Sequence, residues 1–132
     1  MGTAENKELV RGFFADIAKG NLDGALSRLA EDLQFTLIGT TRLSGVFKSR
    51  QEFVDKVMMP LGSQLDGGLT ITPEYIIAEG DFVVMQSRGQ SKTRSGASYN
   101  NTYCQVFRIG GGKIQEMTEY LDTELVTKVF GQ

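Results

Sequence analysis

The segment Tyr99–Asp122, YNNTYCQVFRIGGGKIQEMTEYLD, decides the fold of this 132-residue chain. Its alternating runs, Tyr99–Ile109 and Lys113–Tyr120, flank three consecutive glycines. Alternation of this kind is typical of strands, and glycine tolerates the positive φ angles that a tight hairpin turn requires. The segment therefore predicts two long antiparallel strands joined by a turn at Gly110–Gly112.

The sequence before this hairpin extends the predicted sheet. Leu69–Ala78 and Phe82–Lys92 are rich in strand-forming residues, and Glu79-Gly80-Asp81 between them indicates a tight turn. Asp66-Gly67-Gly68 predicts a loop before this pair, and Leu33–Ile38 predicts one earlier strand. The C-terminal half is therefore expected to form an antiparallel meander.

Helices are predicted mainly in the N-terminal half. Within residues 4–19, apolar side chains recur at spacings of three and four, which places them on one face of a helix. Further helices are expected after Asn21 and Ser49, because both residue types cap helix N-termini, and Pro60 is expected to end or bend the second of these. A short helix is expected after Asp122. Helices segregated from an antiparallel sheet define the α+β class.

The composition excludes several classes of function. The net charge of −2 offers no basic surface for nucleic acid or for an anionic membrane, so neither is expected as a partner. The N-terminus has no apolar signal region, and no apolar run is long enough to span a membrane. We therefore expect a cytoplasmic protein.

The chain has no histidine and one cysteine, Cys104. This excludes Ser-His-Asp and Cys-His catalysis and removes the commonest metal ligand, so no metal and no cofactor are expected. Any catalysis has to use carboxylates, tyrosine, lysine, arginine or amides. Cys104 lies in a predicted strand, where we expect a small buried apolar side chain rather than a reactive thiol.

Two stretches resemble the SnoaL-like branch of the nuclear transport factor 2-like superfamily, which includes ketosteroid isomerases and limonene-epoxide hydrolases. One comprises Gly20–Ala25, Leu33–Gly39 and Leu43–Phe47; the other is the final hairpin with its Glu119–Asp122 ending. The resemblance implies a single α+β domain over residues 1–132, in which a strongly curved, mixed or antiparallel sheet packs on N-terminal helices as a cone-shaped, cystatin-like roll. It also implies a small hydrophobic ligand inside the cone and a homodimer through the outer face of the sheet, but no single reaction.

Strand parity supplies candidate residues for the site, because side chains two residues apart share a face. Three sets mix polar and aromatic side chains, as the wall of a pocket does. They are Val84, Gln86, Arg88 and Gln90; Tyr99, Asn101, Tyr103, Gln105 and Phe107; and Gln115, Met117 and Glu119. From these and the earlier strand, the predicted substrate-binding residues are Asn101, Gln90, Tyr99, Gln105, Phe107, Met117 and Phe35.

Glu119, Arg88 and Tyr103 are the predicted catalytic residues. In the epoxide-hydrolase branch an Asp-Arg-Asp relay activates water, and the resemblance matches Arg88 to the arginine and Glu119 to one acid. Gln90 replaces the other acid, so the relay is incomplete. Glu119 can still act as a lone general acid or base if burial raises its pKa toward neutrality. The alternative is a structural ion pair between Arg88 and Glu119.

Tyr103 and Asn101 can donate hydrogen bonds to a carbonyl or developing enolate oxygen. The alternative for Tyr103 is a core tyrosine, and Asp122 is expected to cap a helix rather than face the pocket. The segment 35–41 contains no aspartate to serve as the base of a ketosteroid isomerase. Three functions therefore stay open: an acid–base isomerase or epoxide hydrolase, a non-catalytic ligand-binding domain, and a protein-interaction module.

Overall fold

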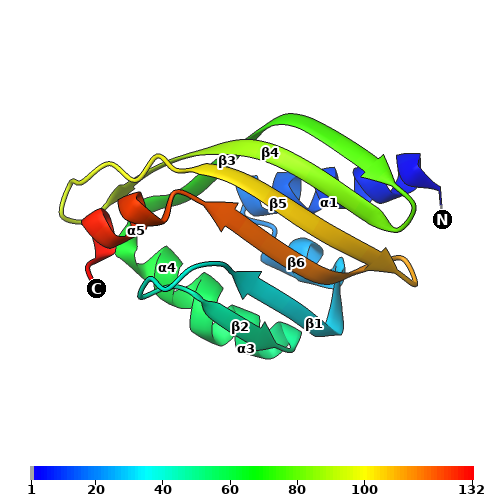
Figure 1. Ribbon diagram of the computed structural model, residues 1–132, viewed down its shortest axis with the longest axis horizontal. Coiled ribbons are helices and arrows are strands. Elements are labelled where there is room, and N and C mark those ends of the chain that lie inside the picture. The colour runs from blue at the N-terminus through cyan, green and yellow to red at the C-terminus, as the bar shows by residue number, and fades with distance from the viewer. Residues whose placement is uncertain (1) are drawn as a thin grey trace.

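The computed structural model describes residues 2–132, which form helices and a single sheet of six strands (Figure 1). The helical segments are α1 (Thr3–Ala18), α2 (Leu22–Ser27), α3 (Arg50–Phe53), the π-helical turn η1 (Val54–Met58), α4 (Met59–Gln64) and α5 (Thr123–Phe130). The strands are β1 (Leu29–Leu37), β2 (Gly45–Lys48), β3 (Leu65–Glu79), β4 (Phe82–Thr93), β5 (Thr102–Gly110) and β6 (Lys113–Leu121). None of the described helices has the length and apolar character needed to cross a membrane.

The sheet is mixed and open. Its strand order is β2-β1-β6-β5-β4-β3, in which β1 runs parallel to β6 and all other neighbours are antiparallel. The strands bend as they pass over the helices, with α1 against β3 and β4 and α3 against β1 (Figure 1). The α+β class, with a curved mixed sheet packed on N-terminal helices, is confirmed.

The core lies between the sheet and α1. The helix contributes Val10 and Phe13, which are almost fully buried because the three-four spacing directs both to one face. From the sheet come Phe107 and Met85, likewise buried and on neighbouring strands. The apolar side chains thus fill the concave side of the sheet except where the cavities described below remain.

The decisive hairpin forms as predicted, with positive φ angles at Gly111 and Gly112. One detail differs: Arg108 pairs with Glu116 and Ile109 with Ile114, so Gln115 is the extra residue of a β-bulge. Ile114 takes the inward position, and the Gln115 amide donates a hydrogen bond to the Gly110 carbonyl at 2.7 Å. Gln115 therefore does not share the inner face with Met117.

Several element boundaries also differ from the predictions. The strand expected from Leu33 begins at Leu29, and the loop expected at Asp66-Gly67-Gly68 lies within β3 as a register shift between Asp66 and Thr70. The strand expected from Tyr99 begins only at Thr102. The short strand β2 was not predicted.

The third predicted helix does not end at Pro60. It continues to Gln64 through η1, whose π hydrogen bonding replaces the α pattern in the turn before the proline. Because proline lacks an amide hydrogen and crowds the preceding turn, a change of helix type is a common way to accommodate it. The resulting α3–η1–α4 segment contacts β1 and β2 through α3 and β3 through α4.

Candidate functional site

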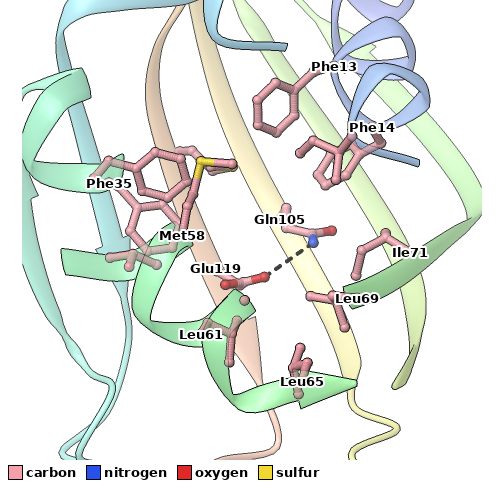
Figure 2. A pocket seen from close by; sticks show the side chains of 15 residues that line it. Phe13, Phe14, Phe35, Met58, Leu61, Leu65, Leu69, Ile71, Gln105 and Glu119 are labelled. Atoms are coloured by element: carbon pink, nitrogen blue, oxygen red, sulfur yellow. Dashed lines mark hydrogen bonds between the residues drawn. The ribbon is translucent and has the colours of Figure 1, made fainter. Parts of the chain in front are cut away.

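A cavity of about 210 Å³ lies between the concave face of the sheet and the helices α1 and α3–η1–α4 (Figure 2). We call it the first cavity. It is lined by Phe13, Phe14, Ile17, Phe35, Phe53, Val57, Met58, Leu61, Gly62, Leu65, Leu69, Ile71, Gln105, Met117 and Glu119. The polar side chains of this lining are Gln105 and Glu119, so two hydrogen-bonding groups face a wall that is otherwise apolar.

Gln105 and Glu119 face each other across neighbouring strands. They are paired residues of β5 and β6, and the Gln105 Nε2 atom donates a hydrogen bond to Glu119 Oε1 at 3.4 Å (Figure 2). On the other side, Ser87 Oγ on β4 donates to Gln105 Oε1 at 2.9 Å. Ser87 and Gln105 are almost completely buried, so this chain across three strands sets the orientation of the amide that contacts Glu119.

The surroundings of Glu119 change its acidity. Burial among apolar side chains raises the pKa of its carboxyl group to about 7, although the hydrogen bond from Gln105 acts in the opposite direction. The side chain stays partly accessible because it faces the cavity. A carboxyl group with this pKa exists in both protonation states at neutral pH, which is the property that a general acid–base requires.

A second cavity of about 290 Å³ adjoins the first. The two share the lining residues Val57, Leu61, Leu69 and Glu119. The rest of the second lining is Leu37, Arg42, Leu43, Ser44, Phe47, Lys56, Pro60, Gln64, Tyr99, Tyr103 and Leu121. Glu119 thus lies where an apolar cavity meets one with several polar groups.

Tyr103 lies in the second cavity near Glu119. Burial raises the pKa of its phenol, and the neighbouring Tyr99 and Glu119 act in the same direction, so it keeps its hydroxyl hydrogen at neutral pH. Its ring packs over Gly89: a Cβ atom at that position would come within 2.8 Å of Tyr103 Cε2. Glycine at position 89 therefore makes room for the ring.

Arg88 and Gln90 lie on the opposite side of the sheet. Arg88 Nε pairs with Glu74 Oε2 at 3.1 Å, and the arginine side chain is 64% exposed. The predicted grouping of Arg88 with Glu119 is wrong, both as a catalytic pair and as an ion pair. Likewise Gln90, which is exposed on the same outer face, lines neither cavity.

Asn101 is buried but is not free to bind a ligand. Its amide nitrogen donates to the Tyr99 hydroxyl at 3.2 Å and to the Asp122 carbonyl at 3.1 Å. Its oxygen accepts from the backbone amides of Thr102 and Asp122, at 2.8 and 3.0 Å. Asn101 thus joins β5 to the start of α5, and the structure does not place it as an oxygen-binding group.

The other predicted binding residues divide between cavity and core. Phe35 and Met117 line the first cavity, together with Gln105, and Tyr99 lines the second with its ring packed edge-on against Phe130 at 4.8 Å. Phe107 lines neither cavity among the described residues. It is fully buried against Phe14, at a ring distance of 6.1 Å, and belongs to the core.

Two further predictions can be compared with the structure. Asp122 caps α5, because its Oδ1 accepts hydrogen bonds from the amides of Glu124 and Leu125, which confirms its expected role. Cys104 is only partly buried, since it alternates with the inward residues Tyr103 and Gln105 and so points to the outer face. In the described part of the chain, no three His, Cys, Asp or Glu side chains are grouped as a metal site.

Sequence reasoning missed Ser87 and the cavity residues of α3–η1–α4 and β3. Ser87 had a usable signal, since it shares strand parity with Val83 and Met85, both buried apolar residues. The lining from Val57 to Leu69 had no such signal. Its contribution depends on how the helix is placed over the sheet.

Comparison with known proteins identifies the class to which this fold and cavity belong. The profile of the SnoaL-like domain matches residues 10–117, and the chain belongs to this family. A relative from Mycobacterium tuberculosis, uncharacterized protein Rv0034, is 28% identical over 126 residues, 93% of each chain. An NTF2-like protein from Burkholderia thailandensis has a TM-score of 0.86 at 24% identity over 98% of each chain. An LEH-like epoxide hydrolase from M. tuberculosis has a TM-score of 0.77 at 17% identity, also over 98% of each chain.

Proposed function

We propose that this protein is a cofactor-independent acid–base enzyme acting on a small, largely apolar molecule, with Glu119 as the proton-transferring group. The observation that carries the proposal is the position of Glu119: a carboxyl group in an apolar cavity, with a pKa raised to about 7. Perturbed carboxyl groups inside cavities are characteristic of acid–base sites. Membership of a family whose structural neighbours include an epoxide hydrolase is consistent with this proposal.

Proton transfer next to a carbonyl fits the site better than epoxide hydration. The hydration relay needs an arginine beside its acids, whereas Arg88 lies on the outer face with Glu74. In the proposed reaction, the Glu119 carboxylate takes a proton from the carbon adjacent to a carbonyl, and the C–H electron pair moves toward the carbonyl oxygen. Neutral Glu119 then returns the proton to the same carbon or to a conjugated one, which gives exchange or isomerisation.

Tyr103 is the proposed donor to the substrate oxygen. Its side chain lines the second cavity together with Glu119, and its hydroxyl stays protonated at neutral pH because burial raises its pKa. A hydrogen bond from a phenol to an enolate oxygen stabilises the charge that develops in the transition state. Gln105 has a different role, since its amide already contacts Glu119 and orients that carboxylate.

The proposal is tested by deuterium exchange. A panel of hydrophobic ketones is incubated with the protein in D₂O, and incorporation next to the carbonyl is followed by mass spectrometry. Glu119→Gln should reduce the protein-catalysed rate by about 10²–10⁴-fold, because glutamine cannot accept the proton. Glu74→Gln, a matched change on the outer face, should leave the rate unchanged. Equal rates for wild type and Glu119→Gln would contradict the proposal.

Non-catalytic ligand binding is a second candidate. It is favoured by one observation: within the described residues, Glu119 is the lone acidic side chain lining either cavity. No second acid in the lining could therefore share the proton transfer with Glu119. Under this alternative, the same ketones raise the melting temperature of the protein but gain no deuterium. The exchange experiment thus separates the two candidates directly.

The homodimer stays a proposal, supported by the outer face of the sheet. This face exposes large apolar side chains on β3, β4 and β6, namely Tyr75, Ile77, Phe82 and Tyr120. An apolar surface of this kind is typical of a face that pairs with another protein surface. We propose a second copy of this chain as the partner, in agreement with the dimer that the family resemblance implies.

A further inference from the structure

The lining of the second cavity includes two positively charged side chains. Arg42 lies in the turn between β1 and β2, and Lys56 lies in η1; both line the cavity, and both are exposed. They come from segments that approach each other only in the folded chain. Two cations from separate elements therefore line one cavity.

These charges are not neutralised by the protein. In the part of the chain that the structure describes, neither Arg42 nor Lys56 forms an ion pair. Arg42 Nη1 donates one hydrogen bond, to the Phe130 carbonyl at 3.1 Å, which leaves other guanidinium hydrogens available. The acid that lines this cavity, Glu119, also lines the first cavity.

The two cavities differ in what they can hold. The first offers an almost wholly apolar wall, whereas the lining of the second includes Glu119, Tyr103 and the two cations. A ligand that occupies both would be apolar at one end and anionic at the other. Its middle would lie beside the carboxyl group that is proposed to move the proton.

We infer that the substrate of this protein is an amphipathic carboxylic acid, whose carboxylate is bound by Arg42 and Lys56 while its apolar body fills the first cavity. The inference deepens the proposed function, on which it rests for calling the ligand a substrate. A carboxylate suits the planar guanidinium group, which can bind it through two parallel hydrogen bonds. A phosphate dianion is less suitable, because apolar side chains such as Leu43 and Phe47 also line this cavity and make desolvation of a double charge costly.

Calorimetric titration of a matched pair of probes tests the inference. The probes are 2-naphthylacetate and its neutral methyl ester, which share the same apolar body. Wild-type protein should bind the acid about tenfold more tightly than the ester at low salt, a difference of the size that charge-assisted hydrogen bonds provide. This preference should shrink as sodium chloride is added, because exposed charges are screened.

Two variants test whether Arg42 and Lys56 cause the preference for the acid over the ester. The double variant Arg42→Gln/Lys56→Gln should lose about tenfold in affinity for the acid and keep its affinity for the ester. Lys48→Gln is the matched control: Lys48 is exposed on β2 but lines neither cavity, so both affinities should stay at the wild-type values.

The possible results separate this inference from the proposed function. Equal binding of acid and ester by wild type would overturn the carboxylate inference alone. The same conclusion would follow if the double variant lost affinity for both probes equally. It would also follow if Lys48→Gln lost as much affinity for the acid as the double variant does. If the acid preference is present but no ketone gains deuterium, the inferred anion site stands and the proposed chemistry fails. If neither probe binds, the carboxylate inference is overturned, and the proposed chemistry is decided by the ketone exchange experiment.

Discussion

Ser87 and Arg88 are neighbours on β4, yet they belong to different environments. Ser87 faces inward, is fully buried and hydrogen-bonds the amide that contacts Glu119. Arg88 faces outward, is largely exposed and pairs with Glu74. The comparison teaches that a row of polar residues on a strand marks its solvent side, whereas one small polar residue among apolar neighbours marks the site.

The same contrast separates the two faces of the whole sheet. The inner face has few polar groups, and three of them form the Ser87–Gln105–Glu119 chain. The outer face has exposed pairs such as Arg108 with Glu116. Buried polar groups affect both stability and chemistry, while exposed ion pairs contribute little. Three predictions sharpen this comparison.

The largest expected effect is the pH dependence caused by Glu119. Its pKa is about 7 in the folded protein against 4.5 for a fully solvated glutamate, so the folded state binds the proton more tightly than the unfolded state. The stabilisation that protonated Glu119 contributes to the folded state is therefore complete below pH 4.5 and is lost as the pH rises to about 7. At pH 8, Glu119→Gln should be more stable than wild type by about 3 kcal/mol.

Urea unfolding between about pH 4 and pH 8 measures this effect across the range in which the proton is released. The difference between wild type and Glu119→Gln should grow with pH and level off above about 7. Glu116→Gln is the outer-face control, because Glu116 pairs with exposed Arg108, and its loss should cost less than about 1 kcal/mol at neutral pH. A pH-independent difference for Glu119→Gln would show that the carboxyl group titrates as it does in water.

A smaller effect is expected for the two neighbours on β4. Ser87→Ala leaves the buried Gln105 Oε1 atom without its donor, so it should destabilise the protein by about 1–2 kcal/mol. Arg88→Gln removes an exposed ion pair and should cost less than about 1 kcal/mol. Ser87→Ala should also slow deuterium exchange, whereas Arg88→Gln should not.

Denaturant unfolding and the exchange assay, applied to both variants, test this ordering. If Arg88→Gln slowed exchange more than Ser87→Ala, the assignment of inner and outer faces to function would be wrong. Ser87→Thr, which keeps the hydroxyl group, should recover most of the exchange rate if the hydrogen bond to Gln105 is what matters.

The smallest effect on the stability of one subunit is expected for Ile77→Lys. Ile77 is 58% exposed on the outer face, so the substitution removes few contacts within the chain. It should nevertheless shift the proposed dimer to a monomer, because an unpaired charge in an apolar interface is unfavourable. Light scattering reports the mass; Lys48→Gln serves as a control. A wild-type monomer, or a variant that stays dimeric, would contradict the proposed dimer face.

Much of β5 and β6 could be predicted from sequence. Alternation over Tyr103, Gln105 and Phe107 is unbroken, and all three side chains point inward as expected. Strand β4 was misassigned because it begins Phe82-Val83-Val84-Met85, which is apolar on both faces. When both sets of alternating positions begin with apolar residues, the hydrophobic pattern does not tell which faces the core.

The sequence by itself determined the class of fold, the turn at the final hairpin and the inward direction of Glu119. These follow from local periodicity and from the backbone freedom of glycine, which act over a few residues. Only the tertiary structure decided three outcomes. Arg88 points away from the cavities, the amide of Asn101 is already hydrogen-bonded within the protein, and Glu119 lines both cavities. Those outcomes depend on how distant segments pack and on the desolvation that packing imposes. The spacing of residues along one strand predicts neither.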